Sequence, residues 1–545
     1  MRSRDDAGAL REEFDGRGAR PRRLSGSIGD RPWMRAANFA QVADPAVALA
    51  PDQIALIEGE VRLSYRELDR RARRVADVLA GRGVGRGDVV ALATGNDWRF
   101  VEALLGTLRL GAVALPLNVR LGRDALAYVV AHSEAKLMIA TEQQAQRIDD
   151  LARIVVGEDY ETALVDAGES DVRAQAEAVE ADDLAMLLYT SGSTGRPKGV
   201  MLSHSNTWWQ ARSQTRTMLH DGHDRGLAMG PLYHANALWL ILLPMLYAGG
   251  SVVILPEFDV GAALAAIGAH GVTYTSGTPS MYTLLLSHPE LERYDVRSIE
   301  LLECGSAPVP AELLRSMIGQ FGCEPVETYG LTEGGANLLT PRWGVKKLGS
   351  TGLPVPDVEI RIVDPDGGER DCHPGEVGEL WTRSPANALG YLRDPATTAQ
   401  RFVADGWLRT GDLMRRDDQG YCYFCGRVDD MISVGGENVY PKEVESVLLS
   451  HAAVRDVGVV GAAHPVKGQA PVAFVVLQPD LPATESELRR HALDHGPAYA
   501  HPRRVFFLDT LPLNATNKLD RGELERRAAE LLPDGLTPGR EPAAP

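Results

Sequence analysis

The sequence has 545 residues, a formal net charge of -17 and 24% charged residues, and these figures exclude several classes of protein. A chain of this length is too long for one ordinary hydrophobic core, so we expect two or more domains. An apolar fraction of 44% is typical of a soluble globular protein. The acidity, which no long basic run offsets, argues against nucleic acid as a partner.

The first 33 residues are rich in arginine but also contain several acidic residues. They include no apolar stretch of signal-peptide length, and the acidic residues argue against an organelle transit peptide. We therefore predict a disordered tail over residues 1–33.

A capping box and a helical hydrophobic pattern predict the first helix. Ser64 and Glu67 have the spacing of such a box, apolar residues then recur at helical intervals, and Gly81 ends the pattern. Strands are predicted at 89–93, 112–117 and 137–140, and helices at 98–110 and 126–131. This alternation predicts parallel sheets covered on both faces by helices.

Residues 189–200 read Tyr-Thr-Ser-Gly-Ser-Thr-Gly-Arg-Pro-Lys-Gly-Val and follow a short apolar run that predicts a buried strand. The glycines let the backbone turn tightly, while the hydroxyl groups, Arg196 and Lys198 add donors and positive charge. No acidic residue occurs in residues 184–220. A loop of this kind beyond the carboxyl end of a strand suits a polyphosphate, whereas the alternative is a solvated Gly/Ser linker.

The stretch is not a Walker loop, because the chain contains no Gly-Lys pair. It resembles the phosphate loop of the adenylate-forming superfamily, which includes acyl-CoA synthetases, peptide-synthetase adenylation domains and beetle luciferases. Further blocks that resemble this family follow in the family's order, and the resemblance extends over about residues 40–525. Within this superfamily, the sequence is most similar to acyl-CoA ligases that act on fatty or aryl acids.

The resemblance implies the residues that bind ATP. In this reading Tyr329 stacks on the adenine, Asp412 accepts both ribose hydroxyls, and Arg427 reaches the ribose or a phosphate. The full implied set is Thr190, Ser191, Gly192, Ser193, Thr194, Gly195, Lys198, Gly305, Ser306, Ala307, Glu327, Thr328, Tyr329, Thr332, Asp412, Arg427 and Lys518.

Glu333 is implied to hold Mg²⁺, an ion that prefers oxygen ligands and needs few protein carboxylates when ATP supplies the rest. A glutamate at a helix start would suit this role and an ordinary N-terminal charge equally well. The residues implied to act in catalysis are Lys518, Glu333, Thr194, Lys198 and His234.

The acyl pocket is implied by residues 232–239, in which His234 would lie beside the reacting carboxylate or be an ordinary structural histidine. Amino-acid-activating relatives have an Asp where this chain has Ala235, which disfavours an amino-acid substrate. Small residues in the pocket leave room for a long or bulky acid, although packing alone also produces such glycines. The implied lining residues are His234, Ala235, Trp239, Tyr282, Gly330, Gly334 and Gly335.

Residues 235–256 carry no charge over 22 positions, a length that could cross a bilayer. Pro244 and the pair Gly249-Gly250 interrupt the segment. We therefore predict a buried helix, a turn and a core strand, and no membrane span.

The C-terminal blocks imply a mobile lid. Asp429 falls at the family's hinge, and Gly435 and Gly436 would line a tunnel for the pantetheine of CoA. Asn517 replaces the usual glycine before Lys518, and Asn is the next-best residue for a left-handed turn.

The expected fold is α/β, with a large N-terminal domain of helix-covered, mostly parallel sheets and a small mobile α+β C-terminal domain. The predicted division is a tail at 1–33, the AMP-binding domain at 34–426, the lid domain at 427–530 and a tail at 531–545.

The five cysteines are an odd number and scattered, which fits a reducing cytosol. Cys422 and Cys425 resemble half of a zinc site, but no second pair exists. Positions three apart on a strand face opposite ways, so we predict no metal or redox role for them.

The predicted activity is that of an ATP-dependent carboxylic acid–CoA ligase, which forms an acyl-adenylate with Mg²⁺ and ATP and then transfers the acyl group to CoA. A fatty or other largely apolar acid is the expected substrate, and a cytoplasmic location is expected. Transfer to an acyl carrier protein or another acceptor is an alternative, as is an inactive nucleotide-binding module; no residue argues for a luciferase-like oxygenase. The oligomeric state stays open, with a homodimer among the alternatives.

Overall fold

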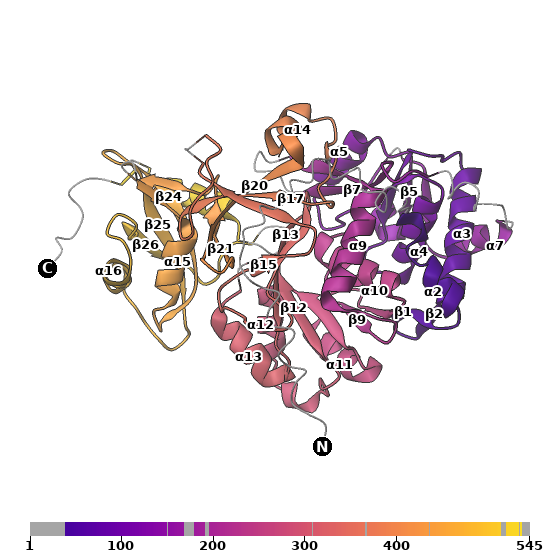
Figure 1. Cartoon of the computed structure of the whole chain (residues 1–545), viewed down its shortest axis with the longest axis horizontal. Helices are drawn as coiled ribbons and strands as arrows, with labels where there is room; N and C mark the ends of the chain where they lie inside the picture. Colours follow the sequence, from indigo (N-terminus) through magenta and orange to yellow (C-terminus); the bar gives the residue numbers. More distant parts are fainter. Residues whose placement is uncertain are drawn as a thin grey trace, which may run out of the picture.

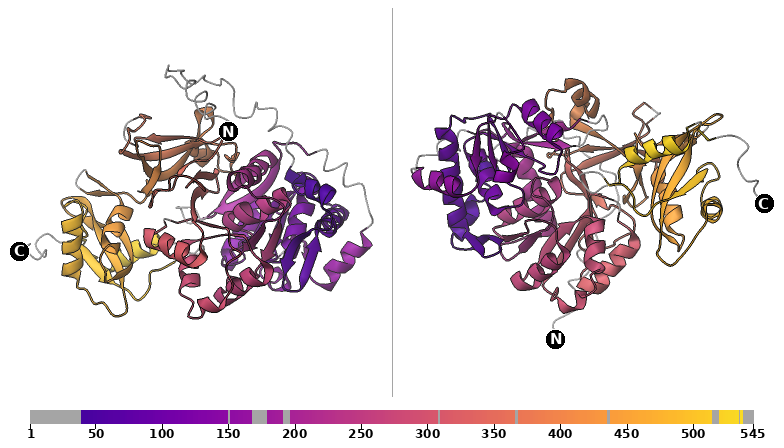
Figure 2. Two further views of the ribbon diagram at one scale, coloured as in Figure 1. Left: turned by 60° about the horizontal axis from the view of Figure 1, so that its bottom comes forward. Right: turned by 180° about the vertical axis from the view of Figure 1, so that it is seen from behind.

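The computed structural model describes residues 39–149, 151–167, 179–190, 196–307, 309–365, 368–434, 437–513, 519–533 and 535–536. Two large sheets and most of the helices form one body, and two smaller sheets follow them in the chain (Figure 1). The C-terminal part, drawn in yellow, lies at one end of the molecule in two further views (Figure 2). The predicted α/β fold with a smaller C-terminal unit is confirmed.

The first large sheet has nine strands, and its six central strands are parallel. Antiparallel strands β2, β14 and β15 extend its two edges. In spatial order the strands are β15 (Leu353–Pro354), β14 (Gly335–Leu339), β13 (Val326–Leu331), β12 (Leu301–Gly305), β11 (Tyr274–Gly277), β9 (Arg225–Ala228), β10 (Ser251–Ile254), β1 (Ile54–Glu58) and β2 (Val61–Ser64).

The second large sheet has seven strands, of which five are parallel. At one edge the chain returns antiparallel from β7 into β8, and β18 pairs with β8. The spatial order is β18 (Gly390–Tyr391), β8 (Lys198–Ser203), β7 (Leu184–Thr190), β4 (Val113–Pro116), β3 (Val89–Ala93), β5 (Leu137–Ala140) and β6 (Arg153–Val155).

Helices lie between the two large sheets and on their outer faces. One core cluster combines buried side chains of both sheets, such as Leu56 of β1 and Leu92 of β3, with residues of α3, α4 and α9. A second cluster packs α11, α12 and α13 on the nine-stranded sheet, and a third packs α5 and α6 on the seven-stranded sheet. The helices of this part are η2 (Phe39–Gln41), α2 (Asp44–Leu49), α3 (Tyr65–Gly81), α4 (Trp98–Arg109), α5 (Arg123–Ser133), α6 (Glu142–Ala145), α7 (Glu158–Asp166), α9 (His204–Met218), η3 (Asn236–Leu242), α10 (Leu243–Ala248), α11 (Val260–His270), α12 (Pro279–Leu286), η4 (Leu291–Arg293) and α13 (Ala311–Phe321).

Local sequence rules explain the first helices. The predicted capping box of α3 is confirmed, since the Ser64 side chain accepts from the Glu67 backbone and the Glu67 side chain accepts from the Ser64 backbone. Asp97 caps α4 by a single bond, in which its side chain accepts from the Arg99 backbone. Gly106 lets α4 approach α3 closely, because a Cβ there would lie 2.6 Å from the Cβ of Val75.

The uncharged segment 235–256 forms the π-helix η3, the short helix α10, a glycine turn and strand β10. The prediction of helix, turn and strand is confirmed. Within the part of the chain that the structure describes, no helix is long and apolar enough to cross a membrane.

Two smaller sheets complete the fold. The first is antiparallel and contains β16 (Glu359–Val363), β17 (Val377–Arg383), β20 (Trp407–Arg416), β19 (Phe402–Val403) and β21 (Cys422–Arg427), with α14 (Pro395–Arg401) and η5 (Ala404–Gly406) between its strands. The last contains β23 (Glu437–Val439), β22 (Ile432–Val434), β25 (Gly468–Leu477), β24 (Val454–His464) and β26 (Arg504–Phe507), with α15 (Pro441–Leu449), α16 (Glu485–His495) and α17 (Arg521–Leu531). The chain crosses from the first of these sheets to the second between Arg427 and Ile432.

Candidate active site

The glycine- and hydroxyl-rich segment joins β7 to β8 in an antiparallel hairpin. Thr190 and Lys198 are paired across its base. Lys198 is half-buried, and the segment begins at the carboxyl end of β7, as expected. The predicted site residues Ser191, Gly192, Ser193, Thr194 and Gly195 lie outside the described residues.

Tyr329, Asp412 and Arg427 lie together, although 98 positions separate the first from the last. The Tyr329 hydroxyl donates to Asp412 Oδ2 at 2.6 Å, and Arg427 Nε lies 3.7 Å from Asp412 Oδ1. The pairing of β20 with β21 sets Asp412 directly opposite Arg427. Removal from water and the nearby Asp412 charge raise the pKa of Tyr329, so the phenol keeps its proton and donates.

Glu333 and Lys198 both contact a third residue, Tyr391. The Tyr391 hydroxyl donates to Glu333 Oε1 at 2.8 Å, and Lys198 Nζ lies 5.7 Å from the centre of the Tyr391 ring. Glu333 lies in the turn that joins β13 to β14 and not at a helix start. The turn is a hairpin because β14 returns antiparallel beside β13.

Tyr391 was not predicted as a site residue. It sits in the two-residue strand β18, opposite Val200 of β8. This pairing joins segments about 190 residues apart, and a lone tyrosine after a glycine carries no sequence signal that would reveal it. The carboxylate, the ammonium group and the buried phenol lie together at the base of the β7–β8 hairpin.

The Glu333 carboxylate has the oxygen chemistry that Mg²⁺ prefers. It accepts from the Tyr391 hydroxyl, and the centre of the same tyrosine ring lies 5.7 Å from the Lys198 ammonium group. Within the described residues, no group of three or more His, Cys, Asp or Glu side chains could hold a metal ion. The donor set therefore fits an ion that takes most of its ligands from a nucleotide and from water.

His234 is half-buried at the start of η3, with its Nδ1 3.4 Å from the backbone N of Asn236. The Asn236 amide nitrogen lies 3.3 Å from Ser276 Oγ and 3.4 Å from Ser306 Oγ. Ser306 has a φ of 66° and is one of the residues expected at the adenine wall. The polar groups of η3 thus face the carboxyl ends of β11 and β12.

Two buried carboxyl groups lie beneath this surface. Burial raises the pKa of Glu303 to about 7, although hydrogen bonds from Thr328, Tyr274 and Gln214 oppose the shift. Burial alone raises the pKa of Glu327 to about 8. The Thr328 hydroxyl, expected at the nucleotide site, is engaged with Glu303.

Packing accounts for several glycines and aromatic residues expected in the acyl pocket. A Cβ at Gly330 would lie 2.5 Å from Gly335 O, and a Cβ at Gly335 would lie 2.3 Å from Gln210 Oε1. Tyr282 is fully buried, and its hydroxyl lies 2.8 Å from Glu303 O. Trp239 is buried on η3, and its indole Nε1 has no hydrogen-bond partner among the described residues.

The remaining expected residues are scattered or undescribed. Close approach of β12 to β13 explains Gly305, whose Cβ would lie 2.5 Å from Thr328 O. Asp429 is exposed in the turn after β21, and Thr332 is half-buried in the β13–β14 turn. Gly435, Gly436 and Lys518 lie outside the described residues. Ala307 follows Ser306 directly and is exposed. Ala235 follows His234 directly and is half-buried.

Sequence comparison relates the chain to known proteins. The sequence pattern of the AMP-binding enzyme family matches residues 44–392, and that of the AMP-binding enzyme C-terminal domain matches residues 443–518. A feruloyl-CoA synthase of Amycolatopsis sp is 36% identical over 486 residues, which are 88% of this chain and 96% of that protein. A 2-succinylbenzoate–CoA ligase of Bacillus licheniformis is 35% identical over 480 residues, which are 87% of this chain and 97% of that protein.

Solved structures give the same result. ATP-bound MatB from Rhodopseudomonas palustris superimposes with a TM-score of 0.84 at 31% identity, covering 91% of this chain and 99% of that one. The o-succinylbenzoate CoA synthetase from Bacillus subtilis, in complex with its acyl-adenylate intermediate, gives a TM-score of 0.78 at 31% identity, with coverages of 90% and 98%.

The chain belongs to the AMP-binding enzyme family, so the resemblance to adenylate-forming enzymes is confirmed. Within that family it is an AMP-forming acid–CoA ligase that works through an acyl-adenylate. ATP, Mg²⁺ and CoA are the small molecules that enzymes of this type use.

Proposed function

We propose that the acid is activated where the β7–β8 hairpin, the β13–β14 turn and β20 meet. The carboxylate oxygen attacks the α-phosphorus of ATP, acyl-AMP forms and pyrophosphate leaves. The CoA thiol then attacks the acyl carbon, and AMP leaves with the bonding electron pair. The first step brings two anions together, so catalysis consists mostly of positioning and electrostatic stabilisation.

One observation carries the assignment of roles: Tyr329 and Glu333, four positions apart on β13 and its turn, reach two separate polar clusters. Tyr329 bonds Asp412, which suits recognition of the nucleoside, while Glu333 shares Tyr391 with Lys198, which suits the phosphates. Bound Mg²⁺ would offset charge on the triphosphate, and Glu333 is the residue that would hold it. Thr194, Lys518 and the hydroxyls of the hairpin complete the proposed phosphate site.

For the acid we propose an aryl or other largely apolar carboxylic acid. His234, Ala235 and Trp239 lie on or next to η3, whose remaining residues are almost all buried and apolar. The relatives act, by their names, on ferulate and succinylbenzoate. An unpartnered indole N–H in Trp239 further suits an acid that carries an oxygen atom able to accept a hydrogen bond.

Acid-dependent exchange of labelled pyrophosphate into ATP tests the first step. A panel of aryl, fatty and dicarboxylic acids should give exchange with an aryl acid in preference to the others. Exchange with none of them, or release of ADP in place of AMP, would contradict the proposal.

Adding CoA tests the acceptor, because mass spectrometry should then show the acyl-CoA. Acyl-AMP that persists with CoA but disappears with an acyl carrier protein would identify the carrier protein as the acceptor.

The five free cysteines fit the proposed cytoplasmic location.

A further inference from the structure

Helix α14 ends at Arg401, a residue that belongs to none of the predicted sites. The helix packs beside β18 and β20 (Figure 1), and Thr398 Oγ1 accepts from the backbone N of Tyr391 at 2.9 Å. The ring of Phe402, the residue after Arg401, lies 5.9 Å from the Tyr391 ring. The end of α14 is therefore close to the tyrosine that contacts Glu333.

Two backbone carbonyls hold the guanidinium of Arg401. Its Nε donates to Arg409 O at 2.5 Å, and its Nη2 donates to Thr410 O at 2.7 Å. These neutral acceptors fix the plane of the guanidinium but leave its full positive charge. Within the part of the chain that the structure describes, no carboxylate forms an ion pair with this half-buried side chain. Arg401 thus supplies a fixed positive charge.

Gly411 is the place where Arg401 meets Arg427. The glycine has a φ of 72°, and a Cβ there would lie 3.6 Å from Arg427 Nη2 and 3.8 Å from Arg401 Nη1. The two guanidinium groups therefore approach the same side of the backbone, one residue before Asp412. Arg427 Nε lies 3.7 Å from Asp412 Oδ1, whereas Arg401 contacts carbonyl oxygens.

The charge of Arg401 also reaches the residues proposed to bind the phosphates. Burial, followed by the Glu333 charge, raises the pKa of Tyr391, while the charges of Arg401 and Arg427 oppose the shift. Arg401 is therefore within electrostatic reach of the Tyr391–Glu333 pair and also lies beside the backbone that leads into Asp412.

We infer that Arg401 binds the α-phosphate of ATP and remains bound to the same phosphate in AMP. In the proposed function, on which this inference rests, the ribose lies at Asp412 and the metal-bound phosphates lie at Glu333. The α-phosphate connects these two parts of the nucleotide. A guanidinium whose plane is already fixed matches phosphate oxygens with its remaining N–H groups. Negative charge accumulates on the same phosphate when the carboxylate attacks, and a fixed cation stabilises that charge.

Arg401→Gln removes the charge and keeps one hydrogen-bond donor for the carbonyls of β20. We expect the Kd of ATP, measured by calorimetry without the carboxylic acid, to rise about 10-fold. This is the lower end of the range for the loss of a charged hydrogen bond, because the side chain is only half-buried. The Kd of AMP should rise by the same factor, since AMP contains the α-phosphate.

Adenosine distinguishes phosphate binding from a purely structural role. It contains the ribose but no phosphate, so its Kd, measured by competition with ATP, should be the same in the wild type and in Arg401→Gln. If Arg401 only tied α14 to β20, its loss would displace Asp412, and adenosine would also bind more weakly. Equal weakening of adenosine, AMP and ATP would therefore overturn the inference. Weakening of ATP with AMP unchanged would also overturn it, because the contact would then be to the β- or γ-phosphate.

Arg401→Lys keeps the positive charge without the planar fork, and it should recover part of the affinity for ATP and AMP that Arg401→Gln loses. A lysine variant that binds no better than the glutamine variant would show that the charge has no part in binding. Arg383→Gln is the matched control, because Arg383 is a guanidinium of the same sheet that donates to Glu359 Oε1 at 3.1 Å. It should leave the Kd of ATP unchanged.

Unchanged affinity for ATP and AMP in Arg401→Gln would overturn the inference while the wild type still bound AMP more tightly than adenosine. Failure of the proposed function would look different, because the wild type itself would then show no preference for AMP over adenosine and no pyrophosphate exchange.

Discussion

Asp412 lies between a phenol and a guanidinium, and this arrangement fixes the orientation of its carboxylate. The Tyr329 hydroxyl occupies Oδ2, and Arg427 lies near Oδ1. Hydrogen bonds to an ionised carboxylate are about twice as strong as neutral ones. In the proposed function this carboxylate accepts hydrogen bonds from the ribose hydroxyls.

Asp412→Asn should raise the KM for ATP about 10- to 100-fold, the range that corresponds to the loss of a charged hydrogen bond. The reason is that an amide accepts more weakly and presents an N–H where an acceptor is needed. Pyrophosphate exchange at varied ATP concentration measures the effect. Asp417→Asn is the control, because Asp417 follows the same strand but pairs with Lys347; equal changes in the two variants would contradict the assignment.

Glu303 is a carboxyl group in the interior whose pKa burial raises to about 7. It is fully buried, and Gln214 Nε2 donates to its Oε2 at 2.7 Å. The Tyr274 hydroxyl contacts the same oxygen and also lies 2.8 Å from Leu240 O. Since a phenol has one proton, a protonated Glu303 satisfies both contacts.

The folded-state pKa of Glu303, about 7, lies above the ordinary value of 4.5, so the folded protein binds this proton more tightly than the unfolded chain. Its contribution to the free energy of unfolding is complete below pH 4.5 and is lost as the pH rises to about 7. A difference of this size corresponds to on the order of 3 kcal/mol.

Glu303→Gln should flatten the decline in stability between pH 5 and pH 7, as measured by urea unfolding at several pH values. The exposed Glu312→Gln on α13 should keep the wild-type slope. A wild-type slope in Glu303→Gln would show that Glu303 is ionised in the folded protein.

At the scale of elements, sequence patterns predicted structure wherever the determining interactions are local. The capping box at Ser64, the buried run before Tyr189 and the glycine turn after α10 all gave the observed elements. The place of Tyr391 beside Glu333 was not predictable, because it depends on a strand pairing between distant segments. The position of His132 beside the β7–β8 hairpin was not predictable either, because His132 belongs to no sequence motif and contacts the hairpin only in the folded structure.

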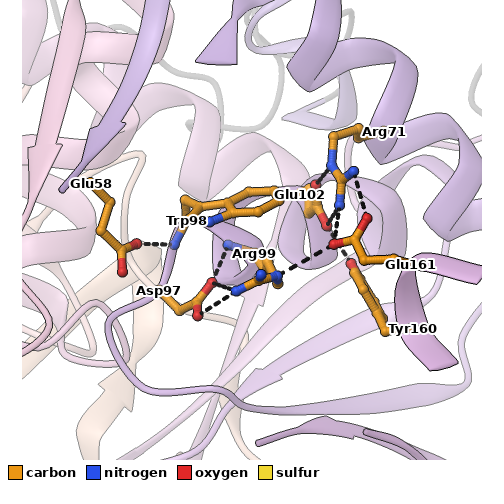
Figure 3. Close-up of polar contacts among 8 residues, drawn as sticks. All are labelled: Glu58, Arg71, Asp97, Trp98, Arg99, Glu102, Tyr160 and Glu161. Atoms are coloured by element: carbon orange, nitrogen blue, oxygen red, sulfur yellow. Dashed lines mark hydrogen bonds and ion pairs between the residues drawn. The ribbon is translucent and has the colours of Figure 1, made fainter. Parts of the chain in front are cut away.

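Charged side chains of the three helices α3, α4 and α7 contact one another (Figure 3). Arg71 of α3 binds Glu102 of α4 with Nε–Oε2 at 2.5 Å and Glu161 of α7 with Nη1–Oε2 at 2.9 Å. The Tyr160 hydroxyl donates to Glu102 as well, and the Glu102 side chain is fully buried. Burial raises the pKa of Glu102, and Arg71 opposes the shift.

Arg71→Ala should lower the free energy of unfolding by about 3–5 kcal/mol, because it leaves a buried carboxylate without its cation. Thermal or urea unfolding at pH 7 measures the loss. Arg66→Ala removes the cation of an exposed pair with Asp52 and should cost less than about 1 kcal/mol. Similar losses in both variants would show that the Arg71 network contributes no more than a surface ion pair.

At the scale of the whole molecule, the last sheet connects to the preceding sheet through a short segment in which Asp429 is exposed. Asp429 lies between β21, whose Arg427 faces Asp412, and β22, which begins the last sheet at Ile432. Lys518 comes from the C-terminal unit, whereas Glu333 and Asp412 come from the two preceding sheets. A reaction that needs all three requires the C-terminal unit in one orientation, and rotation about Asp429 would remove Lys518 while the nucleoside contacts stay in place.

Lys518→Ala should therefore separate the two half-reactions. We expect adenylation, measured by pyrophosphate release, to slow by roughly 10²–10³, by analogy with the loss of one transition-state donor. Transfer of the acyl group from supplied acyl-AMP to CoA should proceed at nearly the wild-type rate, because the proposed rotation about Asp429 moves Lys518 away before that step. Lys467→Ala, in the turn between β24 and β25, is the control for removing a lysine from the same unit. Equal slowing of both steps would mean that the unit keeps one orientation throughout, and the proposed rotation about Asp429 would be wrong.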